Sequence, residues 1–457
     1  MTAHPMDLSC FKAYDIRGRI PDQLNPNLAR DLGKAYATWL QPTKVVVGHD
    51  IRLTSQALTD ALIEGLRSSG VDVFHIGECG TEEIYFATEH FKMDGGIMVT
   101  ASHNPKDYNG MKLVKAESKP ISGDTGLFAI RDLIETQNFD ESSRTGQLQT
   151  LDHRQAYRDR LLRYVDPIER LKPLKIVVNP GNGGAGAVID QLEPDLPFEF
   201  VKVHFGADGN FPNGVPNPML IENRTPTVDA ITSTGADLGI AWDGDFDRCF
   251  FFDHTGRFIE GYYMVGLLAQ AFIEAEPNST IVHDPRLTWN TIDVAEAMGA
   301  RAVMSKTGHA FMKETMRSQD AVYGGEMSAH HYFRDFAYCD SGMVPWLLIT
   351  RLMSEKNQTL AQLVDARMRA FPASGEINRR VENPESVIQA IEHQFKTPDA
   401  VIDRTDGLSL DFTDWRFNLR MSNTEPVIRL NVESRGLPDL MEEKTVQLLT
   451  LIGGEVV

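Results

Sequence analysis

Four polar segments of the chain contain the residue types that most directly suggest chemistry. In chain order they are TASHNP with Ser102, DGDFDR with three aspartates, GEMSAHH with Glu326, and RMSNTEP with Arg420. They offer a hydroxyl nucleophile, carboxylates for a cation, hydrogen-bonding groups for a polar ligand, and a cationic group for an anion. Their value depends on whether the fold brings them together.

Ser102 stands between Ala101 and His103, directly after an apolar run typical of a buried strand. A serine at a strand end can act as a nucleophile when its hydroxyl meets a base. On this segment alone a simple turn is the favoured interpretation, because Ser, Asn and Pro all favour turns. A Ser-His-Asp hydrolase triad is disfavoured, since adjacent Ser102 and His103 point different ways in an extended chain and no GxSxG elbow accompanies them.

Asp243, Asp245 and Asp247 alternate with other residues, so that one loop can present three carboxylates to a hard cation. An EF-hand is excluded, because its sixth and twelfth positions would be Arg248 and His254 instead of Gly and Glu. Mg²⁺ is favoured over Ca²⁺, since a few carboxylates and a phosphate oxygen suit an octahedral ion. The alternative is a solvated acidic turn, which the apolar runs on both sides of the loop disfavour.

The remaining two segments suggest ligand recognition. Glu326, Ser328 and His330 could hydrogen-bond vicinal sugar hydroxyls or touch a phosphate, and the two glycines before them allow close backbone approach. In the last segment two guanidinium groups flank a run of hydroxyls and amides, where a turn could form a phosphate-binding nest. The alternatives are an ordinary polar loop and a capped turn with surface arginines. The residues of the last segment are Arg420, Ser422, Asn423, Thr424 and Arg429.

Three sets of three short apolar runs place the first three segments at strand ends. Helix-like stretches separate the runs, a pattern typical of α/β domains with mostly parallel strands. The last run of each set leads into the segment of Ser102, Asp243 or Glu326, and ligands collect outside the carboxyl ends of such strands. We therefore expect three related α/β domains around one cleft, although a structural duplication whose loops never meet would leave the same pattern. The runs are 44–50, 71–77 and 95–100; 174–181, 198–205 and 236–242; and 279–285, 301–308 and 320–325.

The pattern changes near Phe371. Alternating stretches such as LSLDF and VIRLNVES, followed by an amphipathic tail from Leu437 to Ile452, predict a smaller α+β domain. NPGNGGAG, at 179–186, has neither the GK[ST] of a P-loop nor a GxGxxG pattern and is interpreted as a structural turn. The predicted domain ranges are 1–150, 151–253, 254–370 and 371–457.

Bulk properties exclude several classes of protein. A chain of 457 residues is too long for one core. A net charge of -19 disfavours nucleic acid as a partner, and a small anionic substrate would need basic residues gathered locally. No apolar run approaches the ~20 residues of a membrane span, and no signal peptide is evident. Four scattered cysteines without a CxxC pair predict neither a zinc site nor disulfides, so we expect a cytoplasmic protein.

The order AYDIRG, TASHNP, NGMK, DGDFDR, KTGH, GEMSAHH and R-SNTEP resembles the α-D-phosphohexomutase superfamily over essentially the whole chain, and most of all its bacterial phosphomannomutase branch. The resemblance implies three related α/β domains and a C-terminal α+β domain around a central cleft. It implies that Ser102 is carried as a phosphoserine, and that Asp243, Asp245 and Asp247 hold a Mg²⁺ ion that also touches the Ser102 phosphate.

The resemblance also implies roles for further residues. Glu326 and Ser328 match readers of the sugar hydroxyls, with His330 beside them, and the Arg420 segment matches the binder of the phosphate that is not transferred. Lys112 is the expected proton carrier. Two departures bear on substrate fit: Arg286 stands where a lysine is common, and Ala329 stands where glycine is frequent. The other implied active-site positions are Tyr14, Arg17, His103, Arg248 and His309.

The implied activity is interconversion of mannose 6-phosphate and mannose 1-phosphate through a hexose 1,6-bisphosphate, which also serves as activator, in supply of GDP-mannose synthesis. Phosphoglucomutase or dual-specificity activity is the near alternative, because mannose and glucose differ only at the 2-hydroxyl. A phosphoglucosamine mutase is less favoured, since that branch resembles GEQSGH. A phosphoserine-dependent sugar phosphatase and a catalytically silent sugar-phosphate binder are remote alternatives. We expect a small phosphosugar substrate, no nucleic-acid or membrane partner, and a monomer or homodimer.

Overall fold

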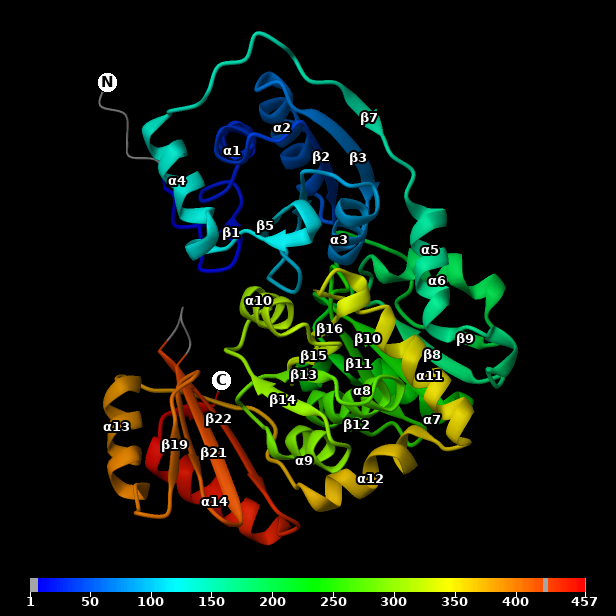
Figure 1. The fold of residues 1–457 in the computed structure, drawn as a ribbon, viewed down its shortest axis with the longest axis vertical. Coiled ribbons are helices and arrows are strands. Elements are labelled where there is room, and N and C mark those ends of the chain that lie inside the picture. The colour runs from blue at the N-terminus through cyan, green and yellow to red at the C-terminus, as the bar shows by residue number, and fades with distance from the viewer. Residues whose placement is uncertain (1–6, 422–425, 457) are drawn as a thin grey trace. The chain divides into compact units, whose positions relative to one another are not determined.

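A computed structural model describes residues 7–421 and 426–456, and the chain divides into two compact units. Unit 1 comprises Met1–Phe258 and His330–Asn357, and unit 2 comprises Ile259–Ala329 and Gln358–Val457. Mixed β-sheets with helices packed on them recur along the chain (Figure 1). Among the described residues, no helix combines the length and the apolar character that a membrane span requires.

The first sheet, in unit 1, has β2 at its centre, with β3 on one side and β4 on the other, all parallel. β5 then pairs antiparallel with β4, and β1 with β5. Val45, Val46 and Val47 of β2 are completely buried, as expected for a central parallel strand covered on both faces. The strands are β1 (Ile16–Arg19), β2 (Lys44–His49), β3 (Asp72–Glu78), β4 (Gly95–Val99), β5 (Tyr108–Lys115), β6 (Lys119–Pro120) and β7 (Leu148–Thr150).

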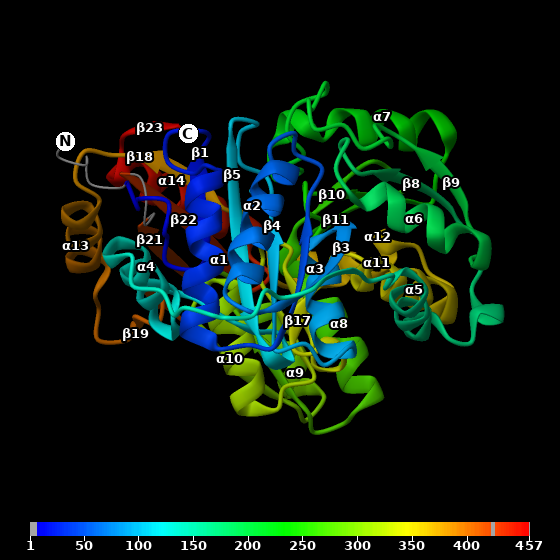
Figure 2. The same ribbon diagram turned by 90° about the horizontal axis from the view of Figure 1, so that it is seen from above.

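Helices α1 and α2 lie side by side along this first sheet (Figure 2). Asn25 caps α1 by accepting hydrogen bonds from the backbone N–H groups of Asn27 and Leu28. Glycine lets the two helices meet backbone to backbone, since a Cβ on Gly65 would lie 2.0 Å from the carbonyl oxygen of Arg30. The helices of this part are α1 (Pro26–Leu40), α2 (Ser55–Ser68), α3 (Thr81–His90) and α4 (Leu127–Thr136).

The second sheet, also in unit 1, repeats the arrangement. Its order is β12-β11-β10-β8-β9, with β9 and β10 parallel to the central β8 and β11 antiparallel to β10. The elements are α5 (Arg154–Leu162), β8 (Lys175–Asn179), α6 (Ala185–Leu192), β9 (Glu199–Lys202), α7 (Thr225–Thr234), β10 (Leu238–Trp242), β11 (Cys249–Asp253) and β12 (Phe258–Ile259). Unit 1 also includes β16 (His331–Phe333), β17 (Cys339–Asp340) and α11 (Val344–Lys356).

Unit 2 contains the third set of parallel strands, with β13 between β14 and β15. Every one of the nine predicted strands is therefore present, and the three sets share one order, in which the first strand lies between the second and the third. This confirms three related α/β domains. The elements are α8 (Gly261–Ala275), β13 (Thr280–His283), α9 (Trp289–Ala297), β14 (Arg301–Met304), α10 (His309–Gln319), β15 (Tyr323–Gly325) and α12 (Leu360–Ala370).

The C-terminal part of unit 2 is an antiparallel sheet of order β19-β20-β21-β22-β18-β23. Its core joins strand residues such as Phe417 and Leu430 to Phe395 of α13 and Leu448 of α14, which confirms the predicted α+β domain (Figure 1). The elements are β18 (Ile377–Arg380), α13 (Pro384–Phe395), β19 (Val401–Asp403), β20 (Leu408–Asp411), β21 (Trp415–Met421), β22 (Val427–Ser434), α14 (Pro438–Ile452) and β23 (Glu455–Val456).

The close approach of α1 and α2 yields a stability prediction. Gly65→Ala should lower the free energy of unfolding by about 1–3 kcal/mol, because the new methyl group collides with backbone that cannot rotate away. Gly206→Ala is the matched control, since a Cβ there meets nothing within 4 Å. Urea denaturation of both variants measures the difference, and equal stability of the two would contradict the helix contact.

Candidate active site

Ser102 lies in the loop after β4 and is almost completely buried. Its φ is +49°, a left-handed conformation that is unusual for any residue except glycine. The strained backbone directs Oγ to 2.8 Å from Oδ2 of Asp243 and 3.1 Å from Nδ1 of His103. The serine therefore meets a carboxylate from a different domain, which a simple turn does not require.

The loop between β10 and β11 presents Asp243, Asp245 and Asp247, whose carboxylate oxygens lie within 4.8 Å of one another and are all buried. The solvated-turn alternative is therefore excluded. Phe246, between the last two aspartates, has a φ of +44° and a fully buried ring. A Cβ on Gly80 would lie 2.1 Å from that ring, so the loop is fixed from inside as well as at its ends.

The glycine turn at 179–186 lies against this acidic loop. The backbone N–H of Gly184 donates to the carbonyl oxygen of Gly244 at 3.2 Å, and a Cβ on Gly183 would lie 2.9 Å from the same oxygen. The turn is structural, as the sequence suggested, and its missing side chains allow the backbone of the acidic loop to approach.

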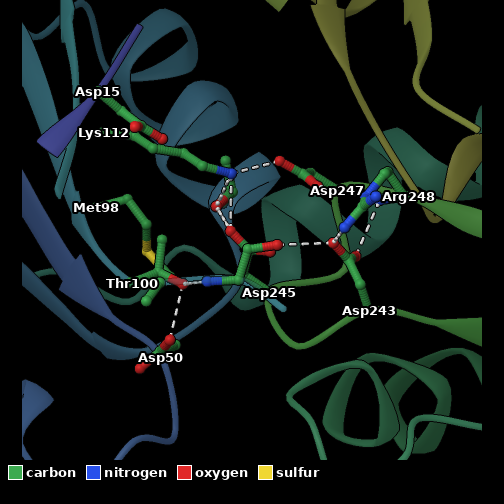
Figure 3. A network of polar contacts seen from close by, with 12 residues as sticks. Asp15, Asp50, Met98, Thr100, Lys112, Asp243, Asp245, Asp247 and Arg248 are labelled. Carbon is green, nitrogen blue, oxygen red and sulfur yellow. Dashed lines mark hydrogen bonds and ion pairs between the residues drawn. The ribbon is translucent and has the colours of Figure 1, made fainter. Parts of the chain in front are cut away.

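Lys112 of β5 directs its ammonium between two of the three carboxylates (Figure 3). Nζ donates to Oδ2 of Asp247 at 2.5 Å and to Oδ2 of Asp245 at 2.8 Å, and Thr81 Oγ1 donates to the same Asp245 oxygen at 2.6 Å. Although burial opposes it, Lys112 lowers the pKa of Asp245. Burial and then the charge of Asp245 raise the pKa of Asp247. The ammonium therefore compensates a dense buried negative charge.

Two arginines complete the charge balance around Ser102. Arg248 donates to Oδ2 of Asp243 at 2.9 Å and also contacts Nδ1 of His103. Arg17 is held by Asp15 at 2.9 Å and donates to the carbonyl oxygen of Ala101 at 2.7 Å. Burial, followed by these two positive charges, holds the pKa of His103 well below its usual range, so its imidazole is neutral at neutral pH.

The acidic loop fits a divalent cation. Oδ1 of Asp245 and Oδ1 of Asp247 are buried and accept no hydrogen bond, although buried carboxylate oxygens are rarely left so. With Oδ2 of Asp243 and Oγ of Ser102 nearby, the donor set is all oxygen, the chemistry that Mg²⁺ prefers. His330 lies 3.7 Å from Oδ1 of Asp247, at the margin of the same group.

In unit 2, the loop after β15 meets Arg286. Nη2 of Arg286 donates to Oγ of Ser328 at 3.2 Å and lies 3.7 Å from Oε1 of Glu326. Nε of the same guanidinium group donates to Oδ2 of Asp284 at 2.8 Å. The backbone N–H of Gly308 also donates to Glu326 at 2.9 Å, which places His309, the first residue of α10, next to this loop.

Arg420 and Arg429, on β21 and β22, share Glu376 with Arg286. Oxygens of Glu376 lie 3.5 Å from Arg286, 3.5 Å from Arg420 and 3.7 Å from Arg429. Burial and then the charge of Arg286 lower the pKa of Arg420, as expected where like charges gather. Three guanidinium groups thus meet around one carboxylate. The predicted phosphate contacts Ser422, Asn423 and Thr424 lie outside the described residues.

The structure groups the predicted site residues by unit. Unit 1 brings together Ser102, His103, Lys112, Arg248 and the three aspartates, with Arg17 behind the serine loop. Unit 2 gathers Arg286, Glu326, Ser328, Arg420 and Arg429, with His309 at the edge. Tyr14 is half-buried and directly precedes the Asp15 that holds Arg17. The catalytic and binding roles of these residues stay predictions.

Sequence reasoning missed several residues that position the site. Thr81 and Phe246 fix the acidic loop, Glu376 joins the arginines, and Asp50 and Arg52 hold the serine loop. One signal could have found the last pair: HD-x-R follows the first strand of two repeats, as HDIR at 49–52 and HDPR at 283–286. The others occur in segments without any distinctive spacing.

Family models match the chain along most of its length. They are described as phosphoglucomutase/phosphomannomutase alpha/beta/alpha domains I, II and III, at residues 9–141, 155–256 and 260–371, and the C-terminal domain, at 376–445. The four matches follow one another in the expected order. The predicted domain boundaries remain a prediction at the level of single residues.

Individual relatives agree with this family. A phosphomannomutase of Escherichia coli K12 is 58% identical, covering 97% of this chain and 99% of that relative. A protein of Xanthomonas campestris named as phosphohexose mutases is 58% identical over 98% of this chain and its own full length. A solved phosphoglucomutase/phosphomannomutase family protein of Burkholderia thailandensis has a TM-score of 0.88 at 30% identity, covering 99% of both chains.

The acidic loop yields a prediction about metal binding. Asp245→Asn keeps the shape of the side chain but removes one ligand charge, and should weaken binding of Mn²⁺, a spectroscopic substitute for Mg²⁺, by at least about 10-fold. Asp253→Asn is the matched control, because Asp253 is buried in the same sheet but pairs with Arg257. Titration followed by electron paramagnetic resonance measures both, and unchanged affinity in Asp245→Asn would refute the site.

Proposed function

The chain belongs to the phosphoglucomutase/phosphomannomutase family, and from that premise we propose that it is a phosphomannomutase that interconverts mannose 6-phosphate and mannose 1-phosphate. The observation that carries the mechanism is the contact between Ser102 Oγ and Asp243 in a buried group of carboxylates and cations. Such a site suits a serine that carries a phosphoryl group, because the added negative charge of a phosphoserine is stabilised by nearby cationic groups.

The residues around Ser102 and a bound divalent cation can supply this stabilisation together. A phosphoserine adds about -1.5 to -2 charges at neutral pH. Arg17 and Lys112 provide positive charge from one side of the serine loop, and Arg248 provides it through Asp243. Mg²⁺ bound by Asp243, Asp245 and Asp247 would stabilise negative charge on the transferring group.

The reaction proceeds in two transfers. The free hydroxyl of the hexose monophosphate attacks the phosphorus of phosphoserine in line, the bond from phosphorus to Ser102 Oγ breaks, and a hexose 1,6-bisphosphate forms. The bisphosphate then gives its other phosphoryl group to Ser102 Oγ and leaves as the isomeric monophosphate. In each step the attacking hydroxyl loses a proton and the departing oxygen gains one, so the enzyme returns to its starting state.

His103 and Lys112 are suited to different roles in the transfer of the proton. His103 is neutral and its Nδ1 lies 3.1 Å from Ser102 Oγ, which suits a proton acceptor. Two carboxylates raise the pKa of Lys112 although burial opposes this, so its ammonium keeps its proton. Lys112 is therefore suited to stabilise negative charge as a cation, and not to activate an attacking hydroxyl as a base.

The arginines of unit 2 suit recognition of the phosphate that is not transferred. Arg286, Arg420 and Arg429 already surround one carboxylate, that of Glu376, and a phosphate dianion presents the same kind of oxygen acceptor with more charge. Glu326 and Ser328 are suited to bind vicinal sugar hydroxyls, since each offers an oxygen beside Arg286. A simple phosphatase would need neither group.

A dual-specificity hexose mutase is the second candidate, because relatives at 58% identity carry the broader name of phosphohexose mutases. The two candidates differ only in how the 2-hydroxyl is treated. Comparison of kcat/KM for mannose 1-phosphate and glucose 1-phosphate, with glucose 1,6-bisphosphate as activator, distinguishes them. A ratio near one would favour the dual-specificity enzyme.

All four cysteines are buried free thiols, which supports the proposed cytoplasmic location.

Removal of the serine hydroxyl tests the mechanism. Ser102→Ala should abolish mutase turnover while largely keeping affinity for the phosphosugar, because Oγ carries the phosphoryl group and the binding residues stay in place. Coupled assay measures turnover, and calorimetry measures binding of mannose 1-phosphate. Ser68→Ala, on α2, is the control and should behave as wild type. Normal turnover by Ser102→Ala would refute a phosphoserine enzyme.

Removal of a guanidinium group tests the phosphate site. Arg420→Ala should weaken binding of mannose 1-phosphate by about 10–100-fold, as expected for loss of a charge-assisted contact of about 1.5–3 kcal/mol. Arg435→Ala is the matched control, because Arg435 follows the opposite end of β22 and stacks on Trp289. Calorimetry compares the two, and equal affinity would count against the assigned role of Arg420.

A further inference from the structure

A buried ion pair that none of the catalytic roles above includes lies beside the strained Ser102 backbone. Asp50 and Arg52 follow β2, both are buried, and Nε of Arg52 lies 3.4 Å from Oδ2 of Asp50. Neither residue contacts Ser102 Oγ. Arg52 instead contacts the backbone of the serine loop directly, and Asp50 contacts it through the hydroxyl of Thr100.

The guanidinium group of Arg52 donates to four backbone carbonyl oxygens between Ser102 and Tyr108. Nη2 donates to Ser102 at 2.9 Å and to Asn104 at 2.5 Å, and Nη1 donates to Pro105 at 2.8 Å and to Tyr108 at 2.9 Å. Both terminal nitrogens are thereby committed to the loop. The remaining N–H of the guanidinium group, that of Nε, is buried on the side of Asp50.

Asp50 is connected to the backbone N–H of Ser102 through the hydroxyl of Thr100. The backbone N–H of Ser102 donates to Oγ1 of Thr100 at 2.9 Å. Oγ1 of Thr100 in turn donates to Oδ2 of Asp50 at 2.7 Å (Figure 3). The N–H and the C=O of Ser102 are therefore both connected to one ion pair. A left-handed φ in a serine costs about 1–3 kcal/mol and persists only where the surroundings impose it.

The second domain covers this arrangement. The ring of Phe211 lies 5.3 Å from the guanidinium carbon of Arg52, and a Cβ on Gly209 would lie 2.3 Å from the carbonyl oxygen of Ile51. The loop that carries Phe211 belongs to the same domain as the acidic loop, so Arg52 contacts the two parts of the chain that must meet for Ser102 to reach Asp243.

The other HD-x-R segment supports a role toward the catalytic loop rather than toward folding alone. Nδ1 of His49 and of His283 each lie 2.8 Å from the carbonyl oxygen of the next residue. The aspartate of each segment accepts a hydrogen bond from the backbone N–H of the arginine, at 3.0 Å and 3.3 Å. In both repeats the arginine then contacts the loop after the third strand. Arg286 contacts side chains of that loop, whereas Arg52 contacts its backbone.

We propose that Arg52, oriented by Asp50, is a positioning residue that fixes the Ser102 backbone in its left-handed conformation and thereby aims Oγ at the acidic loop. The inference rests on the proposed function, in which Ser102 receives and gives the phosphoryl group. It assigns Arg52 to the transfer steps and not to substrate binding, because a serine displaced by about 1 Å can lose about 100-fold in rate.

Arg52→Lys tests this assignment. Lysine keeps the charge, but a single ammonium cannot bridge the carbonyls that two guanidinium nitrogens hold. The rate at which glucose 1,6-bisphosphate phosphorylates Ser102, followed by intact-protein mass spectrometry, should fall about 10–100-fold. kcat should fall in parallel, while KM and the affinity for mannose 1-phosphate stay within about twofold of wild type, as expected where only positioning is lost.

Arg67→Lys is the matched control, because Arg67 lies on α2 of the same domain and also holds a backbone carbonyl, that of Gly146, at 2.9 Å. It should lower Tm without changing the phosphorylation rate. Asp50→Asn is the second variant, since it keeps the arginine and the shape of its partner, and it should give the Arg52→Lys pattern if that variant does not fold.

The outcomes separate the inference from the proposed function. Phosphorylation of both Arg52→Lys and Asp50→Asn at the wild-type rate, or a loss shared equally by Arg67→Lys at the same Tm, would overturn the role of Arg52 alone. Failure of the wild type to accept a phosphoryl group on Ser102 would overturn the proposed function, and the inference with it.

Discussion

Three buried carboxylates on one short loop are the constraint on which the rest of unit 1 depends. Asp243, Asp245 and Asp247 would repel one another strongly away from water, so each needs a nearby positive charge. Lys112 serves two of them and Arg248 serves the third. These two cations come from different domains, and unit 1 must therefore hold its first two sheets in one arrangement for the charges to balance.

The same constraint explains why a phosphoserine and a divalent cation suit each other in this site. With Asp15 and Arg17 included, four carboxylates face three cationic side chains, so the protein groups sum to about one negative charge. A phosphoserine alone would make the site about threefold more negative, and a divalent cation alone would make it positive. Together they add almost no net charge. The charge of the site therefore does not oppose their binding together.

Much of this architecture was predictable from the sequence, because its elements have strong local signals. The apolar runs at 44–50, 174–181 and 279–285 became the central strands β2, β8 and β13, and each third strand leads into a polar loop. DGDFDR combined alternating carboxylates with apolar flanks, which made a buried cation site the favoured interpretation. Ser102 was harder, since a turn and a nucleophile share one composition, and the contact with Asp243 of another domain could not be read from the segment itself.

The residues that escaped prediction act through backbone, and backbone contacts leave little trace in residue types. Arg52 donates to four backbone carbonyl oxygens, and every residue has such an oxygen. The residue types of TASHNP and its neighbours therefore do not indicate that an arginine binds this loop. The role of Phe246 follows from its close contact with Gly80, a residue far away in the sequence, and that contact is visible only in the structure. Comparison of the repeated domains with one another can identify such backbone-binding residues. Because HDIR and HDPR occupy equivalent positions in two repeats, the visible side-chain contacts of Arg286 indicate which loop Arg52 serves, and the same comparison applies wherever a repeated domain keeps a polar residue at its strand ends.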